Sequence, residues 1–481
     1  MPIRQPDIFL ILTDDLGWRD LGCYGSIFHE TPHLDRLARE GMVFSDGYAT
    51  CPVCSPARAS ILTGKAPARV GITNYIAGNP WGRLMGVDYR KELPADEVTI
   101  AERLRQGGYR TVHIGKWHLG GRERWPDRVG FDVNLAGCDW GHPHRGYRAP
   151  WGIPTLPEAA AGTWLTGHLT EQAIRQIEAD DGRPLFLNLW HYTVHTPIQA
   201  PEHLVAKYRA KAARLGLDRI APFADGEAFP CLHKKDQRIR RRLLQSDPAY
   251  AAMMEELDDS VGAVLAAQER RGRLDDTLII FTSDNGGLSS AEGSPTCNAP
   301  LAEGKGWIEE GGVRVPFIVR WGSRIRAGSR SDVPVWGADL YPTFLAAAGL
   351  ALDPRQHADG HDLLPLLTGG AAPPREALFW HYPHYSNQGG TPSCSVRSGD
   401  WKLVEWFEDG RTALYDLRAD PSEAVDLAAA RPELVTRLRA RLAVWRDEVA
   451  ARIPQPNPDY AEMLAGLRPC PDGEGRIPAV R

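Results

Sequence analysis

The chain has 481 residues, of which 43% are hydrophobic and 24% are charged, an ordinary composition for a globular protein with a sizeable core. Its net charge of −5 gives no basis for nucleic-acid binding, and we interpret the basic run at 233–245 as a solvated helix face rather than a polyanion site. No stretch is long and apolar enough to span a membrane, so we expect no membrane partner.

The first residues and the cysteines bear on the cellular compartment. The apolar stretch at 8–12 is too short for the core of a signal peptide and runs directly into two aspartates. The eight cysteines are scattered along the chain and do not resemble a disulfide framework. We therefore expect a cytoplasmic protein, or a periplasmic or secreted one if a leader has been removed.

Short apolar runs alternate with helical patterns over most of the chain. The runs lie within 8–15, 109–120, 185–197 and 277–287, and each ends in polar residues, as buried parallel strands do. A helix is predicted at 99–107, where Thr99 and Glu102 form a capping box, and another at 250–272. This alternation predicts an α/β fold with a large, mainly parallel sheet flanked by helices.

The pattern changes after a Gly- and Pro-rich segment at 369–374, which we interpret as a linker. Short strands with turns at 399–400 and 409–410 follow, and then a helix at 432–451. We expect one domain at 1–370 and a smaller antiparallel α+β domain at 375–481.

Polar residues gather where the predicted strands end, and ligands bind beyond the carboxyl ends of such strands. They are Asp14, Asp15, Lys116, His118, His195, Asp284 and Asn285. The carboxylate and amide oxygens at 14–15 and 284–285 favour Ca²⁺ or Mg²⁺ over zinc, because clustered carboxylates need a cation to offset their repulsion. Together with Arg58 and Lys305, the cationic side chains suit an oxyanion substrate, although each one taken alone is more readily a surface charge or a satisfied histidine.

The segment at 51–58 contains a C-x-x-C pair. No second pair or nearby histidine completes a zinc site with Cys51 and Cys54. Pro56 suits the first turn of a helix, so Cys54 would lie at a helix N-terminus, where free N–H groups favour anions. From these residues alone, a structural cysteine and a nucleophile both remain open.

The order Cys54-Ser55-Pro56-Ala57-Arg58, followed by ASILTG, resembles the signature of type I sulfatases in the alkaline phosphatase superfamily. The resemblance covers most of the chain, because other motifs match in the expected order. They are ILTDDLGWRDLGCYG, GYRTVHIGKWHLGG, HTP, FTSDNGG, GKGWIEEGGVRVPFIVRW, DLYPTFLAAAG and DGHDLLPLLTG. So many long, ordered motifs are highly specific, and they imply an alkaline phosphatase-like sheet in a catalytic domain at 1–370.

The resemblance implies a sulfuric ester hydrolase whose nucleophile is made from Cys54. A formylglycine-generating or radical maturase oxidises that cysteine to Cα-formylglycine, and the aldehyde hydrates to a diol. One hydroxyl attacks sulfur, and the second then expels sulfate. One Ca²⁺, or less favourably Mg²⁺, is implied, with the ligands Asp14, Asp15, Asp284, Asn285 and the modified Cys54.

The resemblance also implies roles for the surrounding side chains. Asp284 takes the attacking proton, and Arg58 and Lys116 hold the diol. His118 takes the second proton. Lys305 and His195 hold sulfate and protonate the leaving oxygen.

The expected substrate is a sulfate ester on a carbohydrate. Segments 138–151 and 380–390 are rich in aromatic, histidine and arginine residues, which suit sugar binding, although ordinary loop packing explains them equally well. The candidate contacts are Asp139, His142, Arg145, His381 and His384. A phosphonate or phosphodiester hydrolase of the same superfamily is the alternative. A non-catalytic protein that binds sulfated glycans is less compatible with the full set of catalytic residues.

Overall fold

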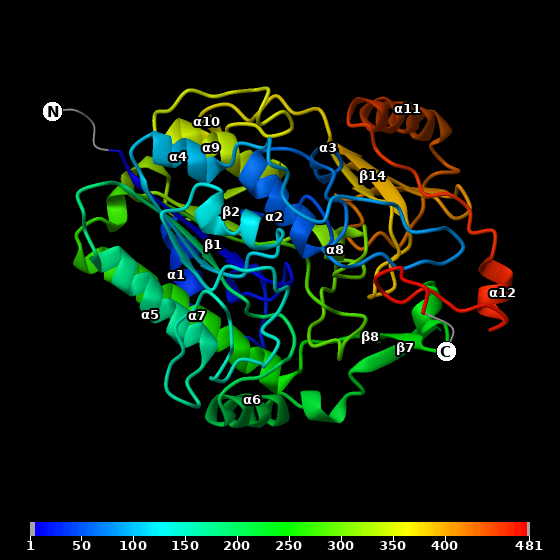
Figure 1. The fold of residues 1–481 in the computed structure, drawn as a ribbon, viewed down its shortest axis with the longest axis horizontal. Helices are drawn as coiled ribbons and strands as arrows, with labels where there is room; N and C mark the ends of the chain where they lie inside the picture. Colours follow the sequence, from blue (N-terminus) through cyan, green and yellow to red (C-terminus); the bar gives the residue numbers. More distant parts are fainter. Residues whose placement is uncertain (1–4, 479–481) are drawn as a thin grey trace.

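The computed structural model describes residues 5–478, and within them the central sheet has eight strands (Figure 1). In spatial order these are β11 (Ser329–Ser331), β2 (Met42–Phe44), β10 (Phe317–Arg320), β9 (Thr277–Ser283), β1 (Asp7–Thr13), β6 (Leu185–Trp190), β4 (Arg110–Gly115) and β5 (Val133–Leu135). Only β10 runs antiparallel to its neighbours. The predicted mainly parallel sheet is confirmed.

Helices cover both faces of this sheet, as Figure 1 shows. One face carries α1 (Pro32–Glu40), α5 (Leu165–Glu178) and α7 (Pro248–Arg270), and α6 (Glu202–Arg214) packs on α7. The other face carries α2 (Cys54–Thr63), α4 (Ile100–Gln106), α9 (Leu340–Ala347) and α10 (Leu364–Leu367). Along β1, Phe9 and Ile11 join the first core and Leu10 joins the second, because successive side chains of a strand point to opposite faces.

The predicted capping box is present in α4. Thr99 Oγ1 accepts a hydrogen bond from the Glu102 amide (3.1 Å), and Glu102 Oε2 accepts one from the Thr99 amide (2.8 Å). The helix predicted at 250–272 begins earlier, at Pro248, after the N-cap Asp247. Both helices therefore form where their sequences indicate.

The interpretation of 233–245 as a helix face is wrong. Its centre is β8 (Arg238–Arg242), which pairs antiparallel with β7 (Phe223–Ala228). Ile239 is fully buried, while the guanidinium groups of Arg240 and Arg242 lie over the ring of Phe223. The arginines thus alternate along a strand, with a period of two rather than that of a helix.

A second sheet, antiparallel throughout, follows the central one in the chain. Its strands are β13 (Leu378–Tyr382), β14 (Ser393–Ser398), β15 (Trp401–Trp406) and β16 (Thr412–Asp416), with α11 (Pro432–Glu448) packed against them. This confirms the expected C-terminal antiparallel α+β unit, whereas the boundary at 370–375 remains a prediction. Trp380 and Leu403 share a core with Ile308 and Trp336 of the preceding part of the chain.

The last described residues return to the earlier part of the chain. The amide of Met85 donates to the carbonyl of Gln455 (2.8 Å), and that of Asn79 donates to Gly473 (2.9 Å). Smaller elements are β3 (Gly47–Tyr48), β12 (Val335–Trp336), α3 (Pro67–Val70), α8 (Glu310–Val313) and α12 (Tyr460–Leu464). Among the described helices, none combines the length and apolar character needed to cross a bilayer.

Candidate active site

The carboxyl ends of β1, β9, β4 and β6 bring the polar residues predicted from the sequence together. Asp14 and Asp15 follow β1, Asp284 and Asn285 follow β9, and Lys116 follows β4. The backbone of Asp15 (φ 62°) lies in the left-handed region, as does that of His118 (φ 58°). Such conformations concentrate at functional sites, where the surrounding structure holds them in place.

Helix α2 brings the cysteine to these strand ends. Cys54 is its first residue, and Arg58 lies one turn further on the same face. Arg58 is fully buried, and its Nε donates to Asp284 Oδ2 (2.8 Å) while Nη1 donates to the carbonyl of Lys116 (3.1 Å). The arginine therefore ties α2 to the ends of both β9 and β4.

Two lysines pair with the two aspartates that follow β1. Lys116 Nζ donates to Asp14 Oδ2 (2.7 Å), and Lys305 Nζ donates to Asp15 Oδ2 (2.7 Å). Burial would raise the pKa of Asp15, but Lys305, then His195 and Lys116, lower it well below its usual range. Burial raises the pKa of Asp14 despite the opposing charge of Lys116. Asp15 is therefore a stable carboxylate, whereas Asp14 lacks sufficient compensating positive charge.

The donor set fits a hard divalent cation. Asp14 Oδ1 and Asn285 Oδ1 are buried and have no hydrogen-bond partner within the described part of the chain. Asp14, Asp15 and His195 also offer ligand atoms within 4.8 Å of one another, but His195 Nε2 already lies 3.0 Å from Lys305 Nζ. The oxygens of the two strand ends are thus the better ligands, and they match the preferences of Ca²⁺.

The tautomers of His118 and His195 are defined, because one ring nitrogen of each lies within hydrogen-bond distance of a backbone carbonyl oxygen. His118 Nε2 lies 3.2 Å from the carbonyl of Ile76 and must donate to it, which leaves Nδ1 as the acceptor, 3.3 Å from Cys54 Sγ. His195 Nδ1 lies 2.8 Å from the carbonyl of Thr196, so its Nε2 accepts from Lys305. Burial, then neighbouring cations, lowers the pKa of both rings, which keeps them neutral.

A cavity of about 310 Å³ opens over these groups. It is lined by Cys54, Tyr75, His118, Gly141, His142, His195, Thr196, Glu292, Lys305, Asn387 and Gln388. The volume is at the lower end of the range for small-molecule pockets. The histidines, the lysine and the cysteine predicted from the sequence therefore face one space.

The predicted substrate contacts divide into two groups. His142 lines the cavity, whereas Asp139 and Arg145 are exposed and do not. His381 is buried, with Nε2 3.0 Å from the carbonyl of Arg452, and His384 is buried, with Nε2 2.8 Å from Thr73 Oγ1. These two histidines pack the segment that carries the cavity residues Asn387 and Gln388.

Tyr75 and Glu292 were missed from the sequence, since neither follows a strand nor belongs to a motif. Asn387 and Gln388 lie in the segment that was singled out at 380–390, but their amides, unlike its histidines, reach the cavity. An amide-rich turn beside a run of aromatic residues is the signal that could have identified them.

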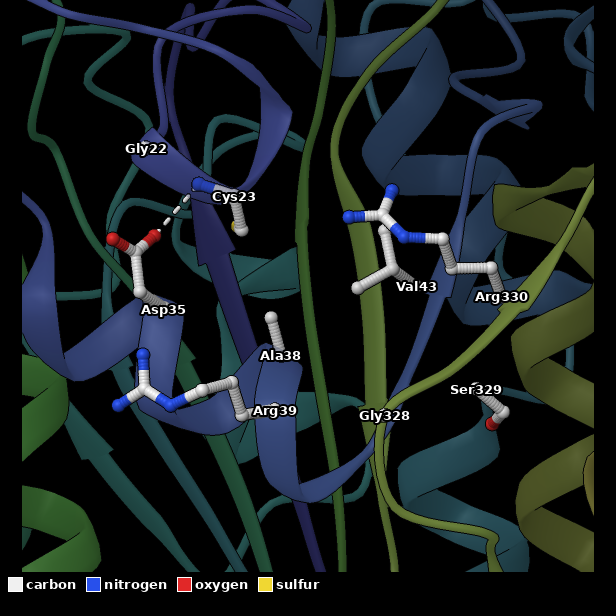
Figure 2. Close-up of a pocket in the computed structure, with 9 residues that line it drawn as sticks. All are labelled: Gly22, Cys23, Asp35, Ala38, Arg39, Val43, Gly328, Ser329 and Arg330. Carbon is white, nitrogen blue, oxygen red and sulfur yellow. Dashed lines mark hydrogen bonds between the residues drawn. The ribbon is translucent and has the colours of Figure 1, made fainter.

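A second cavity, of about 320 Å³, lies between α1 and β11 at the edge of the sheet (Figure 2). Asp35 Oδ1 accepts a hydrogen bond from the Cys23 amide (2.7 Å), and burial, then Asp35, raises the pKa of the Cys23 thiol. Arg39 and Arg330 stand on opposite sides and are exposed. None of the residues predicted from the sequence lines this cavity, so we assign the candidate site to the strand ends.

Comparisons with known proteins agree with this geometry. The Sulfatase family model matches residues 6–350, and the model of the N-sulphoglucosamine sulphohydrolase C-terminal region matches residues 304–448. Arylsulfatase A of Homo sapiens is 33% identical over 471 residues, covering 91% of this chain and 87% of the relative. N-acetylgalactosamine-6-sulfatase of Canis lupus familiaris is 34% identical over 413 residues, covering 84% and 72%.

Solved structures give the same result. The crystal structure of Ps i-CgsB in complex with k-i-k-neocarrahexaose has a TM-score of 0.73 and 28% sequence identity, covering 92% of this chain and 93% of the other. The chain therefore belongs to the sulfatase family of the alkaline phosphatase superfamily and is a sulfuric ester hydrolase.

Proposed function

We propose that the protein removes sulfate from a sulfated sugar, with Cys54 in its formylglycine form and one Ca²⁺ held by Asp14, Asp15, Asp284, Asn285 and position 54. The observation that carries this proposal is the approach of Cys54 Sγ to His118 Nδ1 (3.3 Å), in a cavity shared with Lys305 and His195. A nucleophile, a neutral base and a cation thus face one small space at the strand ends.

Two groups that are absent from the chain as synthesised complete the chemistry. An aldehyde at position 54, once hydrated, supplies two hydroxyl groups on one carbon, one to attack sulfur and the other to release sulfate. Bound Ca²⁺ supplies a Lewis acid next to the nucleophile. A maturase that oxidises Cys54 is therefore a required partner during biosynthesis.

The residues of the chain divide the remaining work. His118 Nδ1, whose lone pair faces position 54, accepts a proton there. Burial would lower the pKa of Lys305, but Asp15, then Glu292, raises it, so the lysine remains a cation that binds sulfate and can protonate the leaving oxygen. His195 accepts a hydrogen bond from Lys305 and orients it. Arg58 holds Asp284 in place and Lys116 holds Asp14 in place.

The names of the relatives and the shape of the cavity support a sugar substrate. N-acetylgalactosamine-6-sulfatase acts on a sulfated sugar by its name, and Ps i-CgsB is solved with a neocarrahexaose. The rim combines Tyr75 and His142 with the amides of Asn387 and Gln388, which suits ring faces and hydroxyl groups.

The test is a substrate panel on matured protein, with the aldehyde at position 54 verified by peptide mass. The panel contains 4-nitrophenyl sulfate, galactose and N-acetylgalactosamine carrying one sulfate at position 4 or 6, and a phenyl phosphonate monoester. We expect sulfate release from the aryl ester and at least one sugar. Faster turnover of the phosphonate than of every sulfate ester would overturn the proposal, and protein with unmodified Cys54 serves as the control.

A further inference from the structure

One wall of the cavity holds a carboxylate that the chemistry above does not use. Glu292 lines the space together with Asn387 and Gln388, and it is the only acidic residue in the described lining. Lys305, which binds sulfate in the proposed mechanism, lines the same cavity. Glu292 and the sulfate-binding position therefore share one space.

Gln388 holds this carboxylate in place. Its Nε2 donates to Glu292 Oε1 (2.8 Å), and its carbonyl accepts from Ser290 Oγ (2.9 Å) and Trp307 Nε1 (3.0 Å). Gly306 makes room for the amide, since a Cβ there would lie 2.8 Å from Gln388 Oε1 and its φ is +81°. The Glu292 side chain is thus fixed from a segment almost a hundred residues further along the chain.

Strand β8 fixes the backbone of the same wall. The amide of Arg242 donates to the carbonyl of Ser289 (2.8 Å), and Ser294 Oγ donates to the carbonyl of Arg240 (2.8 Å). Glu292 itself has φ 53°, a left-handed conformation that a glycine would adopt at lower cost. A glutamate held in that conformation, in a loop fixed on both sides, indicates a role for its side chain.

The other titratable groups that face Glu292 leave it as the main charge next to the alcohol part of a substrate. Burial, then His144, lowers the pKa of His142 to about 4, so this ring is neutral at pH 7. His118 Nδ1 lies against Cys54 Sγ, and Lys305 pairs with Asp15 and His195. Tyr75 is phenolic, since burial, then Glu292, raises its pKa.

We propose that Glu292 selects sulfate esters whose alcohol part is uncharged and carries hydroxyl donors, and that it rejects esters with a second anionic group beside the scissile sulfate. A fixed carboxylate accepts hydrogen bonds from sugar hydroxyls and repels a nearby carboxylate or sulfate. This inference rests on the proposed function and assigns the substrate a class within it, namely an uncharged sugar, such as a hexose or an N-acetylated amino sugar, with one sulfate at the reacting end.

The experiment compares 3-carbamoyl-4-nitrophenyl sulfate with 3-carboxy-4-nitrophenyl sulfate, which are similar in size and differ in charge. The ratio of their kcat/KM values is measured for matured wild type, Glu292→Gln and Glu227→Gln at low ionic strength. Glu292→Gln keeps the shape and removes the charge. Glu227 is the matched control, because it pairs with Arg241 on β8 and does not line the cavity.

We expect Glu292→Gln to lower the preference for the carbamoyl ester by about tenfold, since juxtaposed like charges are strongly disfavoured. Glu227→Gln should keep the wild-type ratio, and added salt should reduce that ratio in wild type. Equal ratios in wild type and Glu292→Gln would overturn the inference while leaving the proposed function standing. Failure of verified, matured wild type to hydrolyse these esters and every sulfate ester of the substrate panel would overturn both.

Discussion

Two buried clusters in this protein contain equal numbers of acidic and basic side chains but differ in how closely those side chains are paired. The strand-end cluster consists of Asp14, Asp15, Asp284, Arg58, Lys116 and Lys305. The second cluster, which we call the junction cluster, consists of Asp46, Glu310, Glu423, Arg314, Arg397 and Lys402. Each combines three carboxyl groups with three cations, so composition alone does not distinguish them.

The junction cluster joins the C-terminal sheet to the rest of the molecule, and its groups pair with one another. Lys402 Nζ lies 3.0 Å from Glu310 Oε1 and 2.9 Å from Glu423 Oε1. Arg314 Nη2 lies 3.1 Å from Asp46 Oδ2, and Arg397 Nη1 lies 2.5 Å from Asp46 Oδ1. Glu423 Oε1 makes no hydrogen bond of good geometry among the described residues, but it lies directly against Lys402 Nζ, so every charge in this cluster has a close opposite charge.

The strand-end cluster is left open. Asp14 Oδ1 and Arg58 Nη2 have no hydrogen-bond partner among residues 5–478, and they lie 3.8 Å apart. Buried polar atoms of this kind are costly unless a ligand completes them. The comparison teaches that the closeness of partners to each buried polar atom, rather than the number of charges, separates a structural cluster from one prepared for a ligand.

The largest loss of activity is expected when the nucleophile beside the strand-end cluster is removed. Cys54→Ser, with the serine verified as unoxidised, should lose about 10⁴-fold or more in kcat, because serine lacks the second hydroxyl that releases sulfate. Peptide mass should show at most one sulfo group per chain. Cys51→Ala is the matched control and should stay active, since Cys51 packs in an apolar group with Val53 and Tyr382. Multiple turnovers by Cys54→Ser would contradict the mechanism.

Asp14→Asn tests whether the open oxygens bind a cation. Activity should fall by about 10³-fold, the scale of several kcal/mol of lost metal assistance. Ca²⁺ should raise the thermal unfolding midpoint of metal-stripped wild type and should not raise that of Asp14→Asn. At a hundredfold excess over Kd, the expected stabilisation of wild type is about 2.7 kcal/mol. Asp46→Asn, in the junction cluster, should lower the midpoint and keep the response to Ca²⁺. An identical response in wild type and Asp14→Asn would exclude this ligand.

Lys402→Met disrupts the junction cluster instead. It leaves Glu310 and Glu423 buried without their shared cation, so the free energy of unfolding should fall by roughly 3–5 kcal/mol in urea titrations. Activity per folded molecule at 25 °C should not change. The double variant Lys402→Met/Glu310→Gln should recover part of the loss, and a double variant that is less stable still would show that charge pairing is not the cause.

The smallest expected effect is a pH dependence of stability from Glu423. Burial, reinforced by Glu310 and opposed by Lys402, raises its pKa from 4.5 to about 8. Between these values the folded chain holds a proton that the unfolded chain has lost, so the free energy of unfolding falls as pH rises. Glu423→Gln should reduce this slope by at most about 1.4 kcal/mol per pH unit.

Urea titrations at pH 5.5, 6.5 and 7.5 measure the slope, with the exposed Glu376→Gln as control. Glu309, whose pKa burial raises to about 7, contributes with the same sign and remains in the variant. A steeper slope in Glu423→Gln would reverse the assignment.

The sequence predicted the sheet and the strand-end residues because local rules determine both. Buried apolar runs become parallel strands, and parallel strands bring their carboxyl ends to one edge, so Asp14, Lys116 and Asp284 had to meet. The capping box at Thr99 is equally local. These features need no knowledge of distant contacts.

The cavity wall could not be predicted in the same way. The position of Glu292 depends on hydrogen bonds to β8 and to Gln388, each between segments far apart in the sequence. The segment at 380–390 was identified by composition, but His381 and His384 turn inward to Arg452 and Thr73. Composition locates such a segment, and only tertiary packing decides which of its side chains face the ligand.

Cys54 is 4% exposed and begins a helix that is buried along its whole length. This burial limits the time during biosynthesis in which the cysteine is accessible to another enzyme. In the proposed mechanism, the oxidising enzyme reaches this cysteine only while α2 is unpacked, so oxidation competes with folding. On the same mechanism, a chain that folds before it is oxidised is structurally complete but inactive. The specific activity of a preparation therefore depends on the relative rates of oxidation and folding. Two samples with identical folds can differ in their fraction of active molecules.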